Sequence, residues 1–201
     1  MTKTRPLQKT CIFGGAFDPI HAGHLKIVEK TGELLSIDRF VWVPTYKSPH
    51  KRLPETPYRH RLKMVRLALA GKKNYSVSSI ESRLPQPSYT LNTIASLKKQ
   101  YGGHNDWYFL MGADNWIIFK SWYKWEEVLN TINILIFPRA GYEIKNLPGG
   151  AQLIKTRLWK KNSTTIRGKL RNNISMEKAG ILPEIKNYIK IHHLYQQNHA
   201  Q

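Results

Sequence analysis

The chain has 201 residues, of which 41% are hydrophobic and 11% aromatic, and this apolar content excludes a wholly disordered protein. Its 32 Lys and Arg residues against 13 Asp and Glu give a formal net charge of +19, which favours polyanionic partners: nucleotides, nucleic acid or an anionic membrane surface. The single cysteine, Cys11, excludes an internal disulfide, and the lack of a signal-like segment or of about 18 consecutive apolar residues predicts a cytoplasmic protein.

Short apolar runs alternate with longer amphipathic stretches along the chain, which is typical of strands alternating with helices. The expected strands are residues 11–13, 40–43, 75–80, 107–111, 133–137 and 152–154. The expected helices are residues 25–35, a helix that opens at Pro57, and residues 89–100, 125–129, 165–172 and 183–194. Because no tight hairpin signal joins the strands, we expect right-handed crossovers and an α/β fold, with a doubly wound, mostly parallel sheet between helices on both faces.

The whole chain, residues 1–201, is expected to form a single domain, because no shift in composition marks a boundary. Residues 1–9 are polar and basic and are expected to be flexible, and residues 161–201 are expected to form a C-terminal helical segment. In a parallel sheet, ligands bind at the carboxyl ends of the strands, where the strand order reverses. The residues with chemical potential in this sequence follow expected strands.

Residues 14–24 follow the first expected strand and read Gly-Gly-Ala-Phe-Asp-Pro-Ile-His-Ala-Gly-His. Gly14 and Gly15 let the backbone approach a ligand closely, and a following helix start offers amides and a positive dipole. His21 and His24 are three residues apart and share one face of the opening helical turn. These features predict a triphosphate site, with a surface histidine pair beside a turn as the alternative. A metal site is less expected, because histidine pairs that bind metal on a helix more often stand four apart.

A second segment, residues 161–167, reads Lys-Asn-Ser-Thr-Thr-Ile-Arg. Ser163 and Thr164 are expected to cap a helix and to aim its amides outward. Arg167, one turn further on, can hold phosphate oxygens through its planar guanidinium. Taken alone, this segment is equally typical of an ordinary helix cap with a surface arginine.

The first segment resembles the (T/H)xGH signature of the nucleotidyltransferase superfamily, and in its GGxFDPxHxGH form it is similar to the bacterial nicotinate mononucleotide adenylyltransferases. Residues 161–167 resemble that family's ISSTxIR segment, with Lys161 and Asn162 in place of Ile and Ser. Residues 87–93 are similar to its PSYTxDT segment, with Asn92 in place of Asp. Weaker similarities at residues 43–51, 111–114, 119–125 and 137–141 extend the resemblance from about residue 11 to residue 194.

The resemblance implies a Rossmann-like fold and an enzyme of NAD biosynthesis that transfers AMP from ATP to nicotinate mononucleotide, giving nicotinate adenine dinucleotide and pyrophosphate. It implies Mg²⁺ bound with ATP and no dedicated metal site in the protein, and it makes residues 161–201 part of the ATP site. The implied catalytic residues are His21, His24 and Arg167. The implied ATP-binding residues are Gly14, Gly15, Ala16, Phe17, His21, His24, Ser163, Thr164 and Arg167. The implied residues for nicotinate mononucleotide are Lys47, Thr90, Asp114, Trp122, Tyr123 and Arg139.

Two other hypotheses remain open on the sequence alone. One is an adenylyltransferase of the same superfamily that acts on nicotinamide mononucleotide or phosphopantetheine. The other is a non-catalytic protein that binds nucleic acid through its positive charge, a hypothesis that gives no reason for the Gly-Gly-x-Phe-Asp-Pro segment. The expected partners are therefore ATP and nicotinate mononucleotide, with neither a membrane nor nucleic acid, and homo-oligomerisation is left open.

Overall fold

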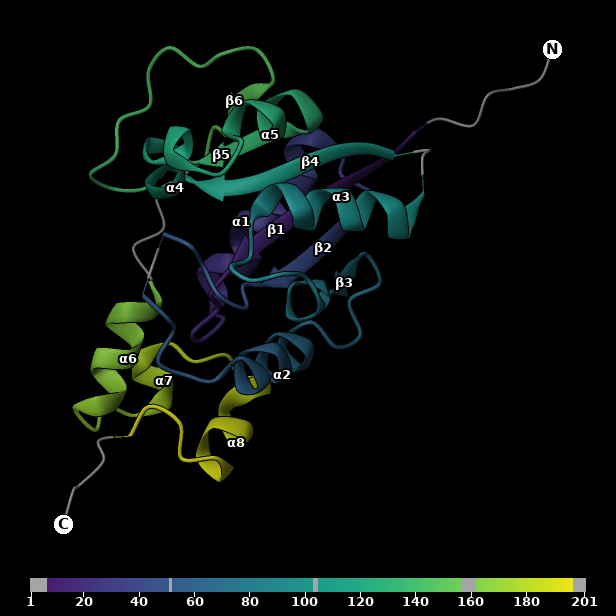
Figure 1. Ribbon diagram of the computed structural model, residues 1–201. Helices are drawn as coiled ribbons and strands as arrows, with labels where there is room; N and C mark the ends of the chain where they lie inside the picture. Colours follow the sequence, from purple (N-terminus) through teal and green to yellow (C-terminus); the bar gives the residue numbers. More distant parts are fainter. Residues whose placement is uncertain (1–6, 51, 103–104, 157–161, 197–201) are drawn as a thin grey trace.

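The computed structural model describes residues 7–50, 52–102, 105–156 and 162–196, and these residues form a six-stranded sheet of strand order β3-β2-β1-β4-β5-β6 (Figure 1). Every neighbouring pair of these strands is parallel, and the order reverses between β1 and β4. The strands are β1 (Gln8–Gly15), β2 (Arg39–Pro44), β3 (Tyr75–Val77), β4 (Asn105–Gly112), β5 (Asn133–Phe137) and β6 (Ala151–Leu153). The predicted Rossmann-like, doubly wound fold is confirmed.

Helices cover both faces of this sheet. The α-helices are α1 (Ala22–Leu35), α2 (Tyr58–Ala68), α3 (Thr90–Tyr101), α4 (Ala113–Ile117), α5 (Trp125–Thr131), α6 (Ser163–Arg171), α7 (Met176–Ala179) and α8 (Pro183–Ile191), and the 3₁₀ helices are η1 (Ile80–Arg83) and η2 (Phe119–Ser121). One hydrophobic core joins one sheet face to α1, α2, α6 and α8, and a second joins the other face to α3 and α5.

Strand β1 shows why this sheet is buried on both faces. Cys11 and Phe13 pack into the first core, whereas Ile12 between them packs into the second. A strand with helices on both faces needs apolar residues at every position, and a continuous apolar run provides them. Burial raises the pKa of the Cys11 thiol, which therefore stays protonated and serves as a small core residue.

The structure differs from the predicted elements mainly at their ends and in short helices. The strand expected at residues 75–80 ends at Val77, and Ile80 already begins η1. Helices α4, α7 and η2 were not expected, because elements of three to five residues carry no clear periodicity. Residues 8 and 9 belong to β1, whereas residues 1–6 of the segment expected to be flexible lie outside the described residues.

Helix α2 buries an apolar face that also carries a charged residue. Its buried residues are Arg61, Met64, Val65 and Ala68, while Leu62 is only half-buried. Apolar periodicity identifies only the apolar residues of a buried helix face, so it does not predict that Arg61 is buried on this one. Arg61 turns out to support the candidate active site.

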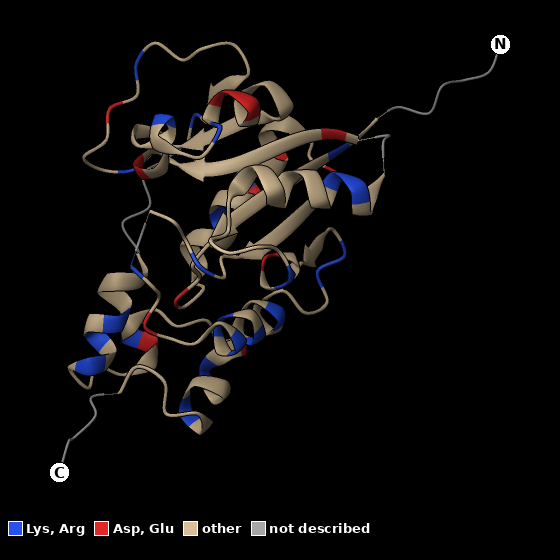
Figure 2. Ribbon diagram, viewed as in Figure 1, with Lys and Arg blue, Asp and Glu red and all other residues tan. Residues whose placement is uncertain are grey.

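The C-terminal helices lie together beside α2 on one side of the sheet (Figure 1). Lys and Arg residues are concentrated over α2, α6 and α8, where acidic residues are sparse (Figure 2). Within the described residues, none of the helices has the length and apolar character needed to cross a bilayer.

Candidate active site

A cleft of about 1100 Å³ opens at the carboxyl ends of the central strands. Its walls include Gly14 and Gly15 at the end of β1, Gly112 at the end of β4, Arg139 after β5, and the first turns of α6. This is the edge of the sheet beside the β1–β4 reversal, where parallel sheets bind ligands. The two sequence segments predicted to bind phosphate, residues 14–24 and 161–167, both contribute to it.

His21 and His24 form a reciprocal cap at the start of α1. The amide of Gly23 donates to Nδ1 of His21 at 3.1 Å, and the amide of His21 donates to Nδ1 of His24 at 3.2 Å. The two rings are stacked, with centroids 3.8 Å apart. His21 is the N-cap residue itself and not part of the first turn, so the pair is held together by capping as well as by the spacing that the sequence shows.

This cap determines where the imidazole protons lie. An Nδ1 atom that accepts from a backbone N–H carries no proton, so a neutral ring carries its proton on Nε2. Burial, His21 and Arg139 lower the pKa of His24 well below its ordinary value of 6.5, so His24 is neutral at pH 7. His24 therefore presents a neutral Nε2–H donor in the wall of the cleft.

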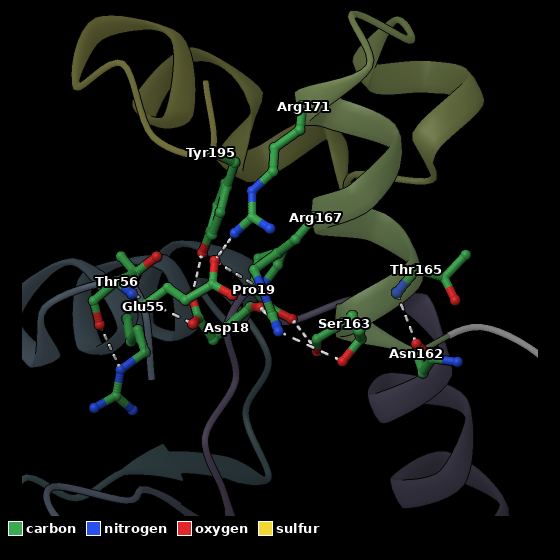
Figure 3. A network of polar contacts seen from close by, with 12 residues as sticks. Asp18, Pro19, Glu55, Thr56, Asn162, Ser163, Thr165, Arg167, Arg171 and Tyr195 are labelled. Carbon is green, nitrogen blue, oxygen red and sulfur yellow. Dashed lines mark hydrogen bonds and ion pairs between the residues drawn. The ribbon is translucent and has the colours of Figure 1, made fainter. Parts of the chain in front are cut away.

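Helix α6 docks directly onto the segment that follows the two glycines. The hydroxyl of Ser163 donates to the carbonyl oxygen of Pro19 at 3.0 Å, and Nη1 of Arg167 donates to the carbonyl oxygen of Asp18 at 2.7 Å (Figure 3). These bonds join residues 144 and 149 positions apart in the chain. The second predicted phosphate segment is thus fixed to the first by hydrogen bonds.

Asn162 is the N-cap of α6, and its side-chain oxygen accepts from the amide of Thr165 at 2.8 Å. Ser163 and Thr164, which were expected to cap this helix, are its first two residues instead. Asn and Ser are equally good N-cap residues, so Asn162 performs the capping expected of a serine at this position. Lys161 lies outside the described residues.

The carboxylate of Asp18 is buried beneath the glycine loop, residues 14–17. Its Oδ1 accepts from the hydroxyl of Tyr195 at 2.8 Å, and its Oδ2 accepts from the amide of Thr56 at 3.3 Å. The buried guanidinium of Arg61 donates to the carbonyl oxygens of Ala16 and Thr56, at 2.7 and 3.0 Å, and interacts electrostatically with Asp18. A buried charge pair of this kind is stable only when hydrogen bonds satisfy both partners.

Arg167 lines the cleft and has an acidic partner there. Its Nε lies 3.4 Å from Oε2 of Glu55, and the same carboxylate forms an ion pair with Arg171, one helical turn further on (Figure 3). Nη2 of Arg167 lies 3.4 Å from the hydroxyl of Thr164. The two guanidinium groups thus already hold one anionic oxygen acceptor, the kind of group that a phosphate also presents.

Asp114 and Arg139 form an ion pair on the opposite wall, with Nε 3.2 Å from Oδ1. A Cβ atom at Gly112 would lie 2.4 Å from that same Oδ1, so a side chain at position 112 would displace Asp114. Glycine at the end of β4 therefore allows the ion pair to sit against the backbone at the cleft.

An aromatic group forms the remaining wall. Trp122 lines the cleft, and the ring of His50 lies nearly parallel to it, with an interplanar angle of 11° and centroids 6.3 Å apart. The indole Nε1–H of Trp122 is buried and has no hydrogen-bond partner among the described residues. Tyr123 is exposed and packs on Tyr89, with centroids 4.5 Å apart.

Lys47 differs from the other predicted site residues, because it lies outside the described lining of the cleft. Its backbone pairs with Ser88: the amide of Lys47 donates to the Ser88 hydroxyl, and the amide of Ser88 donates to the carbonyl oxygen of Lys47. Thr90 does line the cleft, at the start of α3.

Glu81 is a buried cleft residue that the sequence did not indicate. Its carboxylate accepts from the amide of Tyr46 at 2.9 Å and from the hydroxyl of Thr93 at 3.2 Å. It thus joins the loop after β2 to helix α3, and burial raises its pKa. Nothing in the sequence distinguishes Glu81 from the surface carboxylates, because its burial depends on η1.

Comparisons with known proteins agree with this geometry. The family model described as cytidylyltransferase-like matches residues 12–175. A relative from Yersinia pestis is 32% identical over 92% of this chain and 94% of its own, and one from Bacteroides fragilis is 34% identical over 79% and 80%. Both carry the name "probable nicotinate-nucleotide adenylyltransferase". The chain belongs to the nicotinate-nucleotide adenylyltransferase family.

Two further comparisons define the extent of this similarity. A Yersinia enterocolitica member of the family is 38% identical over 65% of this chain, and the aligned part spans 60% of that relative. The nicotinic acid mononucleotide adenylyltransferase of Plasmodium falciparum, solved in complex with NaAD, has a TM-score of 0.75 over 94% of this chain and 97% of its own. Since that structure is 23% identical, it supports the fold.

The predicted activity is therefore confirmed at the level of the reaction. The protein is a nucleotidyltransferase that transfers AMP from ATP to nicotinate mononucleotide in NAD biosynthesis. A non-catalytic nucleic-acid-binding protein does not explain this set of relatives.

Proposed function

We propose that the cleft binds ATP between the glycine loop and α6, and that His21, His24 and Arg167 stabilise the triphosphate and the departing pyrophosphate. The observation that carries this assignment is the docking of α6 on the segment that directly follows the glycine loop, through the bonds of Ser163 and Arg167 to residues 18 and 19. Gly14, Gly15, Ala16 and Phe17 provide backbone at close range, and Ser163 and Thr164 provide hydroxyls and helix-start amides.

The acceptor phosphate attacks the α-phosphorus of ATP. A new P–O bond forms to the nucleotide monophosphate, the bond from the α-phosphorus to the bridging oxygen breaks, and pyrophosphate leaves with that oxygen. The attacking phosphate is already ionised at pH 7, so no general base is required. The protein contributes alignment and stabilisation of negative charge, for which Nε2–H of neutral His24 and the guanidinium of Arg167 are suited.

Mg²⁺ is proposed to enter with ATP. The described residues hold no group of three or more His, Cys, Asp or Glu side chains placed to bind an ion, which fits an ion held by phosphate oxygens and water. Such an ion neutralises phosphate charge during transfer. The chain's own residues orient the phosphates from the two helix starts.

Nicotinate mononucleotide is proposed to bind along the wall that contains Trp122, Tyr123 and Thr90. The parallel His50 ring supports this placement, because it indicates that the indole face accepts a flat ring. The unpartnered Nε1–H of Trp122 suits a carboxylate acceptor. Asp114 is proposed to bind ribose hydroxyls, with Arg139 holding it in place, and Lys47 to lie near the acceptor phosphate.

The decisive experiment compares turnover of nicotinate and nicotinamide mononucleotides by the wild-type enzyme, measured as pyrophosphate release. A clear preference for the acid is expected, and equal rates or a preference for the amide would contradict the proposed contact between the Trp122 Nε1–H and the nicotinate carboxylate. His24→Ala, which removes one donor, should lower kcat about a hundredfold. Normal adenylyl transfer by that variant would exclude the proposed role of His24.

The remaining proposals concern the protein as a whole. Residues 1–201 are proposed to act as one nucleotidyltransferase domain in the cytoplasm, with the C-terminal helices completing the ATP site. Size measurement in solution would establish whether the chain forms a homo-oligomer.

A further inference from the structure

The C-terminal segment that follows α8 returns to the centre of the molecule. Leu194 donates its amide to the carbonyl oxygen of Ile189, which turns the chain back over the end of the helix. Tyr195 is then buried in the core that also contains Phe17 and Met64. Its hydroxyl reaches the carboxylate of Asp18, 177 residues earlier (Figure 3).

The backbone of Tyr195 is unfavourable for a tyrosine. Its φ is +67°, and His193 two residues before it has φ +49°. The left-handed region is strained for a non-glycine residue, and such a conformation persists where the surrounding structure over-determines it. Such positions are frequent at functional sites. The burial of the ring and the bond to Asp18 are the contacts that hold Tyr195 in this conformation.

Asp18 connects Tyr195 to the glycine loop, which is proposed to bind the triphosphate. Asp18 directly follows the glycine loop, and its own carbonyl oxygen receives the bond from Arg167. The residue before it, Phe17, also has a positive φ, of 49°, so the loop is held in a conformation that needs support. The side chain of Asp18 is the anchor of this segment, and Tyr195 is one of its two uncharged hydrogen-bond donors.

We propose that Tyr195 is a positioning residue for ATP: through Asp18 it holds the glycine loop and the carbonyl that receives Arg167 in the geometry that binds the triphosphate. The C-terminal segment after α8 is thus a functional part of the nucleotide site. This inference rests on the proposed assignment of the glycine loop and Arg167 to ATP. Among the described residues, the hydroxyl of Tyr195 bonds to Asp18 and Met64 rather than to the acceptor wall at Trp122, so the effect should be specific for ATP.

The test uses Tyr195→Phe, which keeps the ring and removes the hydroxyl. We expect KM for ATP to rise about tenfold, the change that corresponds to one hydrogen bond with a charged acceptor, and KM for nicotinate mononucleotide to change little. The matched control is Tyr188→Phe on α8, whose hydroxyl contacts Nδ1 of His60 at the α2–α8 contact, away from the loop. That control should leave both KM values unchanged while testing the same chemical change nearby.

A double-mutant comparison with Asp18→Ala shows whether Tyr195 acts through Asp18. If it does, adding Tyr195→Phe to Asp18→Ala changes KM for ATP no further. Direct binding of a non-hydrolysable ATP analogue, measured by calorimetry, gives the same comparison without an acceptor and so separates this inference from the identity of the second substrate. If the wild-type protein failed to bind the analogue, that result would contradict the proposed ATP site itself and not only the role of Tyr195.

Three results would overturn the inference. The first is an unchanged KM for ATP in folded Tyr195→Phe. The second is an equal rise of both KM values, which a general loss of stability produces, with the melting temperature as the check. The third is an effect of Tyr188→Phe as large as that of Tyr195→Phe, which would attribute the loss to docking of α8.

Discussion

Nη1 of Arg167 donates to the carbonyl oxygen of Asp18 at 2.7 Å, and this bond joins the two segments that the sequence predicts to bind phosphate. The guanidinium thereby has a fixed position at the wall of the cleft before any nucleotide arrives. A preorganised donor needs no rearrangement when charge develops on a phosphate, which is the condition for electrostatic catalysis.

Arg167→Lys should lower kcat/KM for ATP by roughly tenfold to a hundredfold. Lysine keeps the charge but cannot hold the Asp18 carbonyl and a phosphate at once with the planar fork of arginine. Steady-state kinetics at saturating acceptor would measure this, with Lys169→Ala on the same helix as the control. A lysine variant as active as wild type would show that only the charge matters at position 167.

Acidification should destabilise the protein below pH 6.5 through His24. Its folded-state pKa lies well below 6.5, so between that value and 6.5 the unfolded chain binds more protons than the folded one. The free energy of unfolding therefore falls as the pH is lowered through this window. His60, whose pKa burial also lowers, contributes in the same direction.

Urea denaturation of wild-type protein and His24→Gln at pH 7.5, 6.5 and 5.5 checks this expectation. The wild-type protein should lose more stability across the series than the variant, which has no ring to protonate at position 24. Identical losses in the two proteins would mean that other groups dominate the acid response.

Asn162→Ala should lower the free energy of unfolding by about 1 kcal/mol, the usual cost of removing an N-cap. Because α6 carries Arg167, the same variant should raise KM for ATP. Asn162→Ser is the matched control, since serine caps equally well and should restore both values. Thermal denaturation and kinetics of the two variants would measure these effects, and a serine variant as poor as the alanine one would argue against capping.

Glu81→Ala should raise KM for nicotinate mononucleotide severalfold and leave KM for ATP nearly unchanged. The carboxylate joins the Tyr46 amide to the Thr93 hydroxyl, so its loss frees the loop after β2 from α3 on the acceptor side of the cleft. A buried amide left without its acceptor is costly. Glu81→Gln should recover most of the affinity, because its oxygen can accept from Tyr46 and the Thr93 hydroxyl can accept from its NH₂ group.

Steady-state kinetics with each substrate varied in turn measures the Glu81 effects. Glu33→Ala, in an exposed pair with Lys30 on α1, serves as the control for loss of a carboxylate. Equal effects on the two substrates would indicate a general structural role for Glu81.

The sequence by itself determined the local parts of this protein. The apolar run at residues 11–13 specifies a strand buried on both faces, and the histidine spacing at positions 21 and 24 brings two rings to one helix start. These features depend on neighbours within about one helical turn, so periodicity and motif reveal them. The alternation of expected strands and helices was sufficient to predict the parallel sheet, and the order of the motifs was sufficient to predict the reaction.

Only the tertiary structure decided which residues support the site from a distance. Arg61, Glu81 and Tyr195 are buried and bonded to segments 35 to 177 residues away, and on the sequence they resemble surface charges or core aromatics. Asn162 became recognisable as a cap only once the start of α6 was known. A buried polar group is identified by the partner that satisfies it, and that partner is chosen by the fold.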